Sequence, residues 1–204
     1  MTAERNPENT RDKILMAAFQ EMHKHGYQGM RVDQVLKITG FKKGALYHHF
    51  SSKQALGYAV LEERIKKRMT ELWIEPLKKC HDPLECIHSL FIALDTTWSD
   101  DFFYQGCPLN NLAQEMSPID EGFRERIEKF FQEWQDALSA SLKQGQELKI
   151  VDAKINTDDS ALFIIATQEG ALGMTKNFQN KDVYYRCAKE LKRYLDSLKF
   201  QVKG

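Results

Sequence analysis

The sequence predicts an all-α protein, in which a small N-terminal group of three helices precedes a larger helical region. Three observations support this fold class. Apolar residues recur every three or four positions over long segments, strand-like alternation is scarce, and only five of the 204 residues are proline. Hydrophobic residues make up 42% of the chain. That share is enough for a substantial core.

The first 50 residues predict three short helices. Thr10 is a candidate N-cap for the first helix, which is expected to end at Gly26. The second is expected to end at Gly40, and the third covers about 43–49. The spacing of apolar residues indicates that the second helix packs on the third through Val35, Phe41, Leu46 and Phe50.

Six further helices are expected after residue 50. Ser51 and Gln54 have the spacing of a capping box that starts a long fourth helix, and Pro76 and Pro83 interrupt the pattern after it. Ser117 with Pro118, Thr157 and Asn180 are the expected starts of the last three helices. The predicted helices after the fourth are 83–98, 106–115, 119–147, 158–178 and 182–200.

Positive charge is concentrated at the N-terminal end of the chain. Residues 1–70 carry 13 Lys and Arg against 7 Asp and Glu, a net charge of +6. Residues 71–204 carry 16 against 22, a net charge of −6, so the whole chain is neutral. Such asymmetry indicates a polyanionic partner for the basic part. An accidental imbalance between solvated surfaces is the alternative.

The third predicted helix carries the residue types of a helix that enters a DNA groove. Its outward side would show Lys42, Lys43, Ala45, Tyr47 and His48, while Gly44 allows a close approach of the backbone. Lysine suits phosphates or guanine edges, and a small residue can contact a thymine methyl group. Lys53 lies at the start of the next helix, where free N–H groups favour an anion. A solvated basic helix in an ordinary bundle is the alternative.

Residues 32–56 resemble the helix-turn-helix signature of TetR-type regulators. The matching segments are Val-Asp-Gln-Val-Leu-Lys-Ile-Thr and Gly-Phe-Lys-Lys-Gly-Ala-Leu-Tyr-His-His-Phe-Ser-Ser-Lys-Gln-Ala-Leu. The resemblance implies an all-α homodimer with an N-terminal DNA-binding domain, residues 1–52, whose helix-turn-helix spans about 33–52. Residues 53–204 would form an effector-binding and dimerisation domain. The implied function is a ligand-responsive regulator, most simply a repressor, that binds double-stranded operator DNA.

The same resemblance assigns roles to single residues. Lys43, Ala45 and His48 are placed to meet bases, and the phosphate contacts are assigned to Tyr47, His49 and Lys53. Two departures are visible, because Arg31 and Lys42 occupy positions where the family commonly has a helix cap. Each lost cap costs on the order of 1 kcal/mol. Both residues add a cation beside the predicted DNA surface and are counted with it.

The effector half is rich in aromatic residues that suit a small, largely apolar ligand. Most of these rings, taken one at a time, are expected to be ordinary core. The candidate pocket residues are Asn110, Asn111, Gln114, Trp134, Gln168 and Lys176.

Cys107 has two interpretations. It begins a predicted helix, which lowers the pKa of a thiol, and its segment resembles one in regulators that sense electrophiles or oxidants. There, Lys176 would approach the thiol. The alternative, which we favour, is a small buried residue in a pocket for a non-covalent ligand.

Cys80 and Cys86 lie near His81 and His88, but their spacing matches no zinc motif. We therefore expect neither a metal nor another cofactor. Disulfides are not the default in the cytoplasmic protein that the sequence suggests.

The last two predicted helices are candidates for dimerisation, because small residues on the first of them, such as Gly170 and Gly173, let helices approach closely. Closure of the monomer's own core is the alternative.

Other classes of function have little support. The chain lacks a phosphate-binding loop, HExxH, GxSxG or a dinucleotide fingerprint, so an enzyme is not expected. No apolar run reaches the length of a membrane span. A helical adaptor that binds only protein is the rival from a different class, but it has no use for the basic N-terminal surface.

Overall fold

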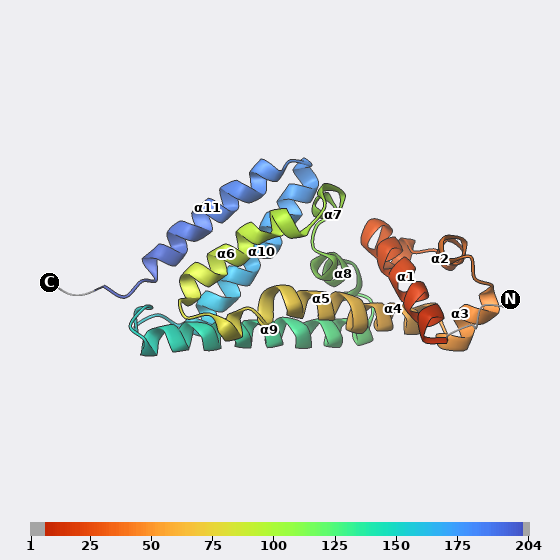
Figure 1. Cartoon of the computed structure of the whole chain (residues 1–204), viewed down its shortest axis with the longest axis horizontal. Helices are drawn as coiled ribbons and strands as arrows, with labels where there is room; N and C mark the ends of the chain where they lie inside the picture. Colours follow the sequence, from red (N-terminus) through yellow and green to blue (C-terminus); the bar gives the residue numbers. More distant parts are fainter. Residues whose placement is uncertain (1–6, 202–204) are drawn as a thin grey trace. The chain divides into compact units, whose positions relative to one another are not determined.

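The computed structural model describes residues 7–201 of the chain and is built from helices (Figure 1). Within these residues, the only β-type pairing is an isolated bridge between Val151 and Lys199. The first elements are α1 (Pro7–Gly29), α2 (Val32–Thr39), α3 (Lys43–His49) and α4 (Lys53–Val60). The last are α8 (Pro108–Met116), α9 (Glu121–Glu147), α10 (Thr157–Phe178) and α11 (Lys181–Ser197). Helix therefore dominates, as the period of the apolar residues predicts.

The middle of the chain contains shorter and less regular helices. The helix that begins with α4 continues to residue 74, and its hydrogen bonding widens twice to the π pattern. Helix α6 (Pro83–Thr97) begins with Asp82 as N-cap and proline in its first turn, and α7 (Asp100–Tyr104) follows it. The other segments are η1 (Leu61–Lys66), α5 (Lys67–Met69), η2 (Thr70–Ile74) and η3 (Leu77–Lys79).

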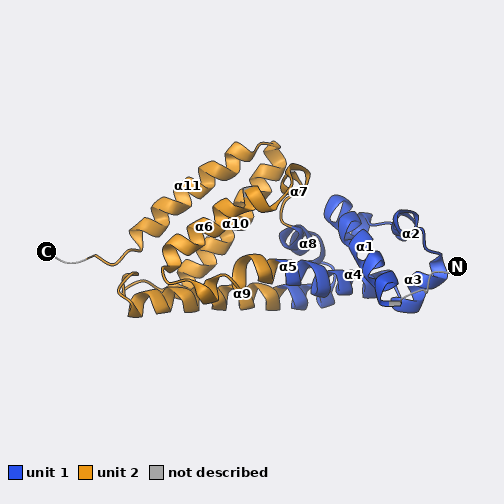
Figure 2. Cartoon of the chain, in the orientation of Figure 1, with its two compact units in different colours: residues 1–68, 108–127 blue, residues 69–107, 128–204 orange. Residues whose placement is uncertain are grey.

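The chain divides into two compact units (Figure 2). Unit 1 contains Met1–Arg68 and Pro108–Ile127, and unit 2 contains Met69–Cys107 and Glu128–Gly204. The three N-terminal helices are thus accompanied in unit 1 by α4, α8 and the first turns of α9. About 50 residues alone would bury too little surface to be very stable, so these helices add to the core of the unit.

Each unit has its own apolar core. In unit 1, α1 packs against α2, α3, α4 and α8, and its Ile14, Leu15 and Ala18 are buried. In unit 2, α11 turns back along α10 after a short connection and also packs on α6 (Figure 1). The largest fully buried side chains of unit 2 are aromatic: Phe91, Phe103, Phe130, Trp134 and Tyr184.

Five predicted helix starts are wrong by one to four residues. Thr10 lies inside α1, which already contains Pro7, a residue suited to a first turn. Ser52 instead of Ser51 caps α4, since its hydroxyl accepts the N–H of Ala55 at 3.0 Å. Ser117 and Pro118 lie in the turn that follows α8, and α9 starts at Glu121, where the Asp120 carboxylate accepts the N–H of Phe123.

The start of α10 is also shifted, because Asn156 and not Thr157 accepts the N–H groups of the first turn. Asn180 does cap α11, as expected. The helix predicted at 106–115 begins later, at Pro108, and α7 escaped prediction because it has only one and a half turns.

The expectation of free thiols holds for only two of the four cysteines. Cys80 and Cys86 form a disulfide, with their Cα atoms 6.1 Å apart. Cys80 ends the segment η3 and Cys86 lies in the first turn of α6, so the intervening bend brings the two side chains together. Cys107 and Cys187 are free. Within residues 7–201, no group of three or more His, Cys, Asp and Glu side chains is arranged to hold a metal.

Candidate functional site

A glycine turn sets the geometry between α2 and α3. Gly40 has a φ of 71°, the left-handed conformation that glycine adopts readily, and its N–H bonds to Leu36 O to end α2. Val35 of α2 and Leu46 of α3 are fully buried, and Phe50 is nearly so. Phe41 is only half-buried. The apolar side of α3 is therefore held inward much as the sequence predicts.

The opposite side of α3 is open to solvent. Lys42, Lys43, Gly44 and His48 are exposed, as is Tyr47 with 41% of its surface accessible. Ala45 and His49 are partly exposed. The amine of Lys43 lies 5.9 Å from the ring centre of Tyr47. A Cβ added to Gly44 would meet no atom within 4 Å, so the fold of this chain leaves the surface over Gly44 empty.

The two departures at the helix caps are visible in the structure. Arg31 and Lys42 occupy the N-cap positions of α2 and α3, and neither side chain makes a capping hydrogen bond. Arg31 is exposed next to α2. Both starts therefore keep backbone N–H groups that no cap satisfies, at positions flanked by cations.

His48 and His49 lie side by side, with ring centres 5.1 Å apart. Partial burial, followed by the nearby charges of His48 and Arg11, lowers the pKa of His49. The lowered pKa favours the neutral imidazole of His49, which can donate one N–H to a phosphate.

Lys53 is held against the last turn of α1. Its amine donates a hydrogen bond to Gln28 O at 3.0 Å and lies 5.0 Å from the ring centre of Tyr27. An ammonium group has three N–H donors, so this bond leaves donors for a phosphate. The contact fixes the position of the Lys53 side chain at the start of α4.

The last turn of α1, which follows the non-helical Gly26, is also held by an acidic residue that the sequence did not reveal. Glu115 of α8 accepts the backbone N–H groups of Tyr27 and Gln28, both at 2.8 Å. Gly26 has a φ of 75°, and a Cβ there would lie 2.8 Å from a carboxylate oxygen of Glu115. Gly26 is thus required both by its backbone conformation and by this close contact. We call Glu115 with these two N–H groups the α8 clamp.

A second acidic residue joins α4 to the start of α9 within unit 1. Asp120 accepts hydrogen bonds from Tyr58 and Gln54, each at 2.8 Å, and from the N–H of Phe123. Burial opposes ionisation of Asp120, but these hydrogen bonds outweigh it and lower the pKa of the carboxyl group. Arg126 covers the Tyr58 ring at 4.2 Å.

The residues predicted to line an effector pocket are divided between the two units. Cys107, Trp134 and Gln168 are buried in unit 2, and Lys176 of the same unit is exposed. The other three, Asn110, Asn111 and Gln114, belong to α8 in unit 1; the two asparagines are half-buried and Gln114 is exposed.

The interior of unit 2 joins polar groups to a series of aromatic rings. The Tyr184 hydroxyl donates to Gln168 Oε1 at 2.8 Å and lies 3.1 Å from Phe91 O. The Tyr184 ring contacts Phe91 and Phe103, and Phe91 continues the contacts to Trp73, whose ring meets Trp134.

Glu169 is the buried acid of this interior, and sequence reasoning missed it. Burial raises its pKa to about 7, and the neighbouring Cys107 thiol partly opposes that rise. Its signal in the sequence was a charged residue next to Gln168, on the side of α10 that also carries Ala161, Ile164, Ile165 and Leu172. A carboxylate beside a thiol disfavours the thiolate, because both would then be negative. This environment favours Cys107 as a buried interior residue over Cys107 as a reactive sensor.

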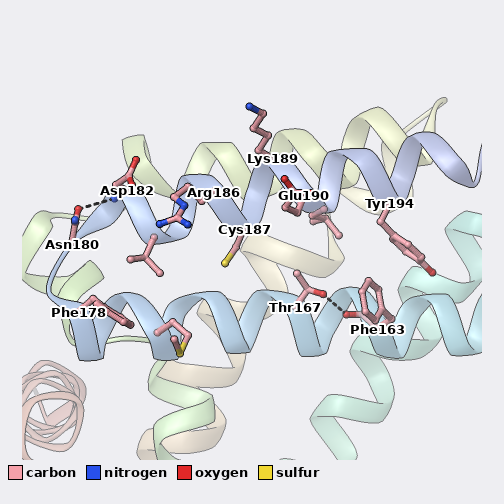
Figure 3. A pocket seen from close by; sticks show the side chains of 13 residues that line it. Phe163, Thr167, Phe178, Asn180, Asp182, Arg186, Cys187, Lys189, Glu190 and Tyr194 are labelled. Atoms are coloured by element: carbon pink, nitrogen blue, oxygen red, sulfur yellow. Dashed lines mark hydrogen bonds between the residues drawn. The ribbon is translucent and has the colours of Figure 1, made fainter.

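An open groove of about 810 Å³ runs between α10 and α11 (Figure 3). Apolar and charged side chains line it together. Figure 3 shows Phe163, Thr167 and Phe178 on α10, facing Arg186, Cys187 and Tyr194 on α11. Phe163 and Met174 are 49% exposed and Phe178 is 58% exposed, which is unusual for large apolar side chains.

These features define a class of protein: a helix-turn-helix regulator with a separate helical body. The family described as "Bacterial regulatory proteins, tetR family" matches residues 14–60, and "Tetracyclin repressor-like, C-terminal domain" matches residues 83–191. The chain belongs to the TetR family of transcriptional regulators. Proteins of this family bind DNA as dimers and respond to ligands.

Named relatives agree with this assignment. An HTH-type transcriptional regulator in the lacX 3' region of Lactococcus lactis subsp. lactis is 33% identical over 178 residues, 87% of this chain and 89% of that protein. The HTH-type transcriptional repressor DhaR of Mycobacterium sp. (strain GP1) is 26% identical over 84% of this chain and 85% of its own length.

A solved structure supports the fold. The crystal structure of a TetR transcriptional regulator from Chloroflexus aurantiacus superposes with a TM-score of 0.84 and 22% identity, covering 98% of this chain and 100% of that one. Among residues 7–201, no helix is both long and apolar enough to cross a membrane.

Proposed function

We propose that this protein is a repressor that binds operator DNA as a homodimer and is released by a small molecule bound in unit 2. The DNA-binding part of this proposal rests on α3, which has one buried apolar side and one exposed basic side. Leu46 is fully buried in the N-terminal core, whereas Lys43, Tyr47 and His48 project to solvent. This arrangement presents a rigid, cationic helix to a major groove.

Within this proposal, residues 1–52 form the DNA-binding domain and residues 53–204 bind the effector and the second subunit. Lys43, Ala45 and His48 read base edges, while Tyr47, His49 and Lys53 contact phosphates. Arg31, Lys42 and Gly44 lie at the rim of the same surface. The Lys53 amine would contact its phosphate from a position already fixed by the hydrogen bond to Gln28 O. Little side-chain entropy would therefore be lost on binding.

A second copy of the chain is the proposed partner for the outer surface of α10 and α11. Exposed Phe163, Met174 and Phe178 line the groove between these helices, and Gly170 lies on the same helix. A Cβ added to Gly170 or Gly173 would meet nothing within 4 Å, so the small residues leave room for another helix. Two helices from each subunit would form a four-helix interface.

DNA binding is tested with a duplex that covers the region upstream of the protein's own gene. We expect affinity to fall steeply with salt, because each neutralised phosphate releases counterions. Lys53→Ala should weaken specific and random duplexes by similar factors, whereas His48→Ala or Lys43→Ala should reduce the preference for the operator. Fluorescence anisotropy at several salt concentrations measures both effects.

The matched control is Lys129→Ala, which removes an exposed lysine of α9 in unit 2. It should leave affinity and salt dependence unchanged. Equal losses on specific and random duplexes for all three α3 and α4 variants would contradict the proposed division between base and phosphate contacts.

A further inference from the structure

The buried carboxyl group of Glu169 has little to satisfy it. Within the described residues, neither oxygen accepts a hydrogen bond from a nitrogen or oxygen donor, and the donor beside the carboxyl group is the Cys107 thiol, a weak one. Only 7% of the Glu169 surface is accessible. Removing a carboxylate from water without a partner is costly, so its place in the interior needs a compensating group.

Other polar atoms around the same aromatic rings are also unsatisfied. The indole N–H of Trp134 and that of Trp73 are buried without an acceptor. One polar atom of the Gln168 amide has no partner either, while the other meets the Tyr184 hydroxyl. This holds whichever way the amide is turned, because the hydroxyl can satisfy only one of its two ends.

These groups come from separate elements but are linked by contacts. Gln168 and Glu169 lie on α10, Tyr184 on α11 and Phe91 on α6, and Cys107 ends the segment after α7. Burial raises the pKa of Tyr184, and the nearby charge of Glu169 adds to that rise. Glu169 therefore belongs to the ring-lined interior of unit 2 and not to its solvent-exposed surface.

The chemistry of Glu169 selects among ligands. A neutral aromatic molecule would pack against the rings but would leave the carboxyl group of Glu169 without a charged partner. An anion would place a second negative charge beside it. A protonated nitrogen supplies both N–H donors and the opposite charge, and such bonds are about twice as strong as neutral ones.

We propose that the effector of this protein is an aromatic amine or amidine, whose protonated nitrogen pairs with Glu169 while its apolar body lies among the rings around Tyr184. This inference rests on the proposed function, since it places the ligand in the unit assigned to effector binding. It refines the expectation of a largely apolar effector by adding one cationic group.

The test uses the full chain and two aromatic bodies, each in three charge forms. The probes are benzylamine, benzyl alcohol and benzoate, with naphthylmethylamine, naphthylmethanol and naphthoate as the larger set. Thermal shift and calorimetry are measured near neutral pH. We expect at least one amine to raise the Tm and bind at least about tenfold more tightly than its alcohol. The carboxylates should show no binding.

Glu169→Gln keeps the size of the side chain and removes its charge. This variant should bind the amine no better than the alcohol, whereas Glu147→Gln, at an exposed position of α9, should bind like the wild type. The amine should also weaken operator binding by the wild type and not by Glu169→Gln. Because the variant replaces an unpaired group, its ligand-free Tm should not fall, which separates lost binding from lost folding.

Three results would overturn the inference: no amine binding by the wild type, alcohol or carboxylate binding as tight as the amine, or unchanged amine binding by Glu169→Gln. Each of these leaves operator binding by the ligand-free protein intact. Absence of salt-dependent operator binding would instead count against the proposed function itself.

Discussion

Two glutamates of this protein have different properties because different groups surround their carboxylates. Glu115 and Glu169 are both glutamates on helices, yet Glu115 is satisfied by two backbone N–H groups and Glu169 by none from the backbone. The first stabilises a turn beside the DNA-binding helices. The second keeps a pKa of about 7 inside unit 2. Their consequences for pH are therefore different.

Glu169 makes folding stability fall as pH rises from about 4.5 to about 7. In this window the unfolded chain has lost the proton, whereas the native carboxyl group, with its raised pKa, retains it. The native state therefore binds more protons, and its stability declines by an amount on the order of 3 kcal/mol before levelling off above the native pKa.

Glu169→Gln should remove this contribution, so that its stability advantage over the wild type grows across the same window. Urea unfolding of both proteins at a series of pH values measures the difference, and histidine titration cancels in the comparison. A constant difference from pH 5 to pH 8 would show that the carboxyl group is not protonated in the native state.

At the scale of elements, the α8 clamp links α8 to the last turn of α1, which leads into α2. Two hydrogen bonds to a charged acceptor are stronger than neutral ones, about 1.5–3 kcal/mol in a buried setting. Glu115 is only partly buried, so a smaller effect is expected. Because α2 follows this turn directly, the clamp influences how α2 and α3 are held against α1.

Glu115→Gln should weaken the clamp, since an amide offers one acceptor oxygen and no charge. We expect faster hydrogen exchange at the amides of Tyr27 and Gln28, and operator affinity reduced by about threefold to tenfold. Residue-resolved hydrogen exchange and anisotropy measure the two effects. Gln114→Ala, one residue away and exposed, is the control. Unaltered exchange at both amides would refute the role of the clamp.

At the scale of the whole molecule, the proposed dimer would cover a surface that is open in the single chain. The open groove of α10 and α11 exposes large apolar side chains, which a second copy is proposed to cover. In such an assembly two α3 helices would meet successive turns of a duplex, so that affinity requires both subunits.

Gly170→Glu should convert the protein to a monomer. The position is exposed and empty in one chain, so the new side chain fits there, and replacing a helical glycine favours the helix by about 0.5–1 kcal/mol. A partner helix would be blocked by the added bulk and charge. Light scattering after size exclusion measures the mass. The control is Ala140→Glu, at an exposed position of α9. A dimeric Gly170→Glu would place the interface elsewhere.

The helices and the α3 surface followed from local patterns in the sequence. Apolar spacing identified α2 and α3, Gly40 marked the end of α2, and the outward Lys43, Tyr47 and His48 are exposed as expected. Helix starts were less predictable. Neighbouring polar residues such as Ser51 and Ser52 compete for one cap, and the chosen one depends on where the preceding helix places the backbone.

The structure of the effector half could be predicted from the sequence only in part. Cys107, Trp134 and Gln168 are buried, whereas Gln114 and Lys176 are exposed, and an effector contact for any of them stays a prediction. The disulfide between Cys80 and Cys86 also depends on a bend that spacing does not reveal.

The sequence by itself determined the all-α class, the helix-turn-helix segment and the family, because each depends on contacts between residues near one another in the chain. Only the tertiary structure decided that Glu115 holds the last turn of α1 and that Glu169 is buried beside Cys107. Those contacts join segments far apart in sequence. Whether a buried carboxylate has hydrogen-bond partners depends on which distant groups folding places beside it. Local residue patterns do not predict those contacts.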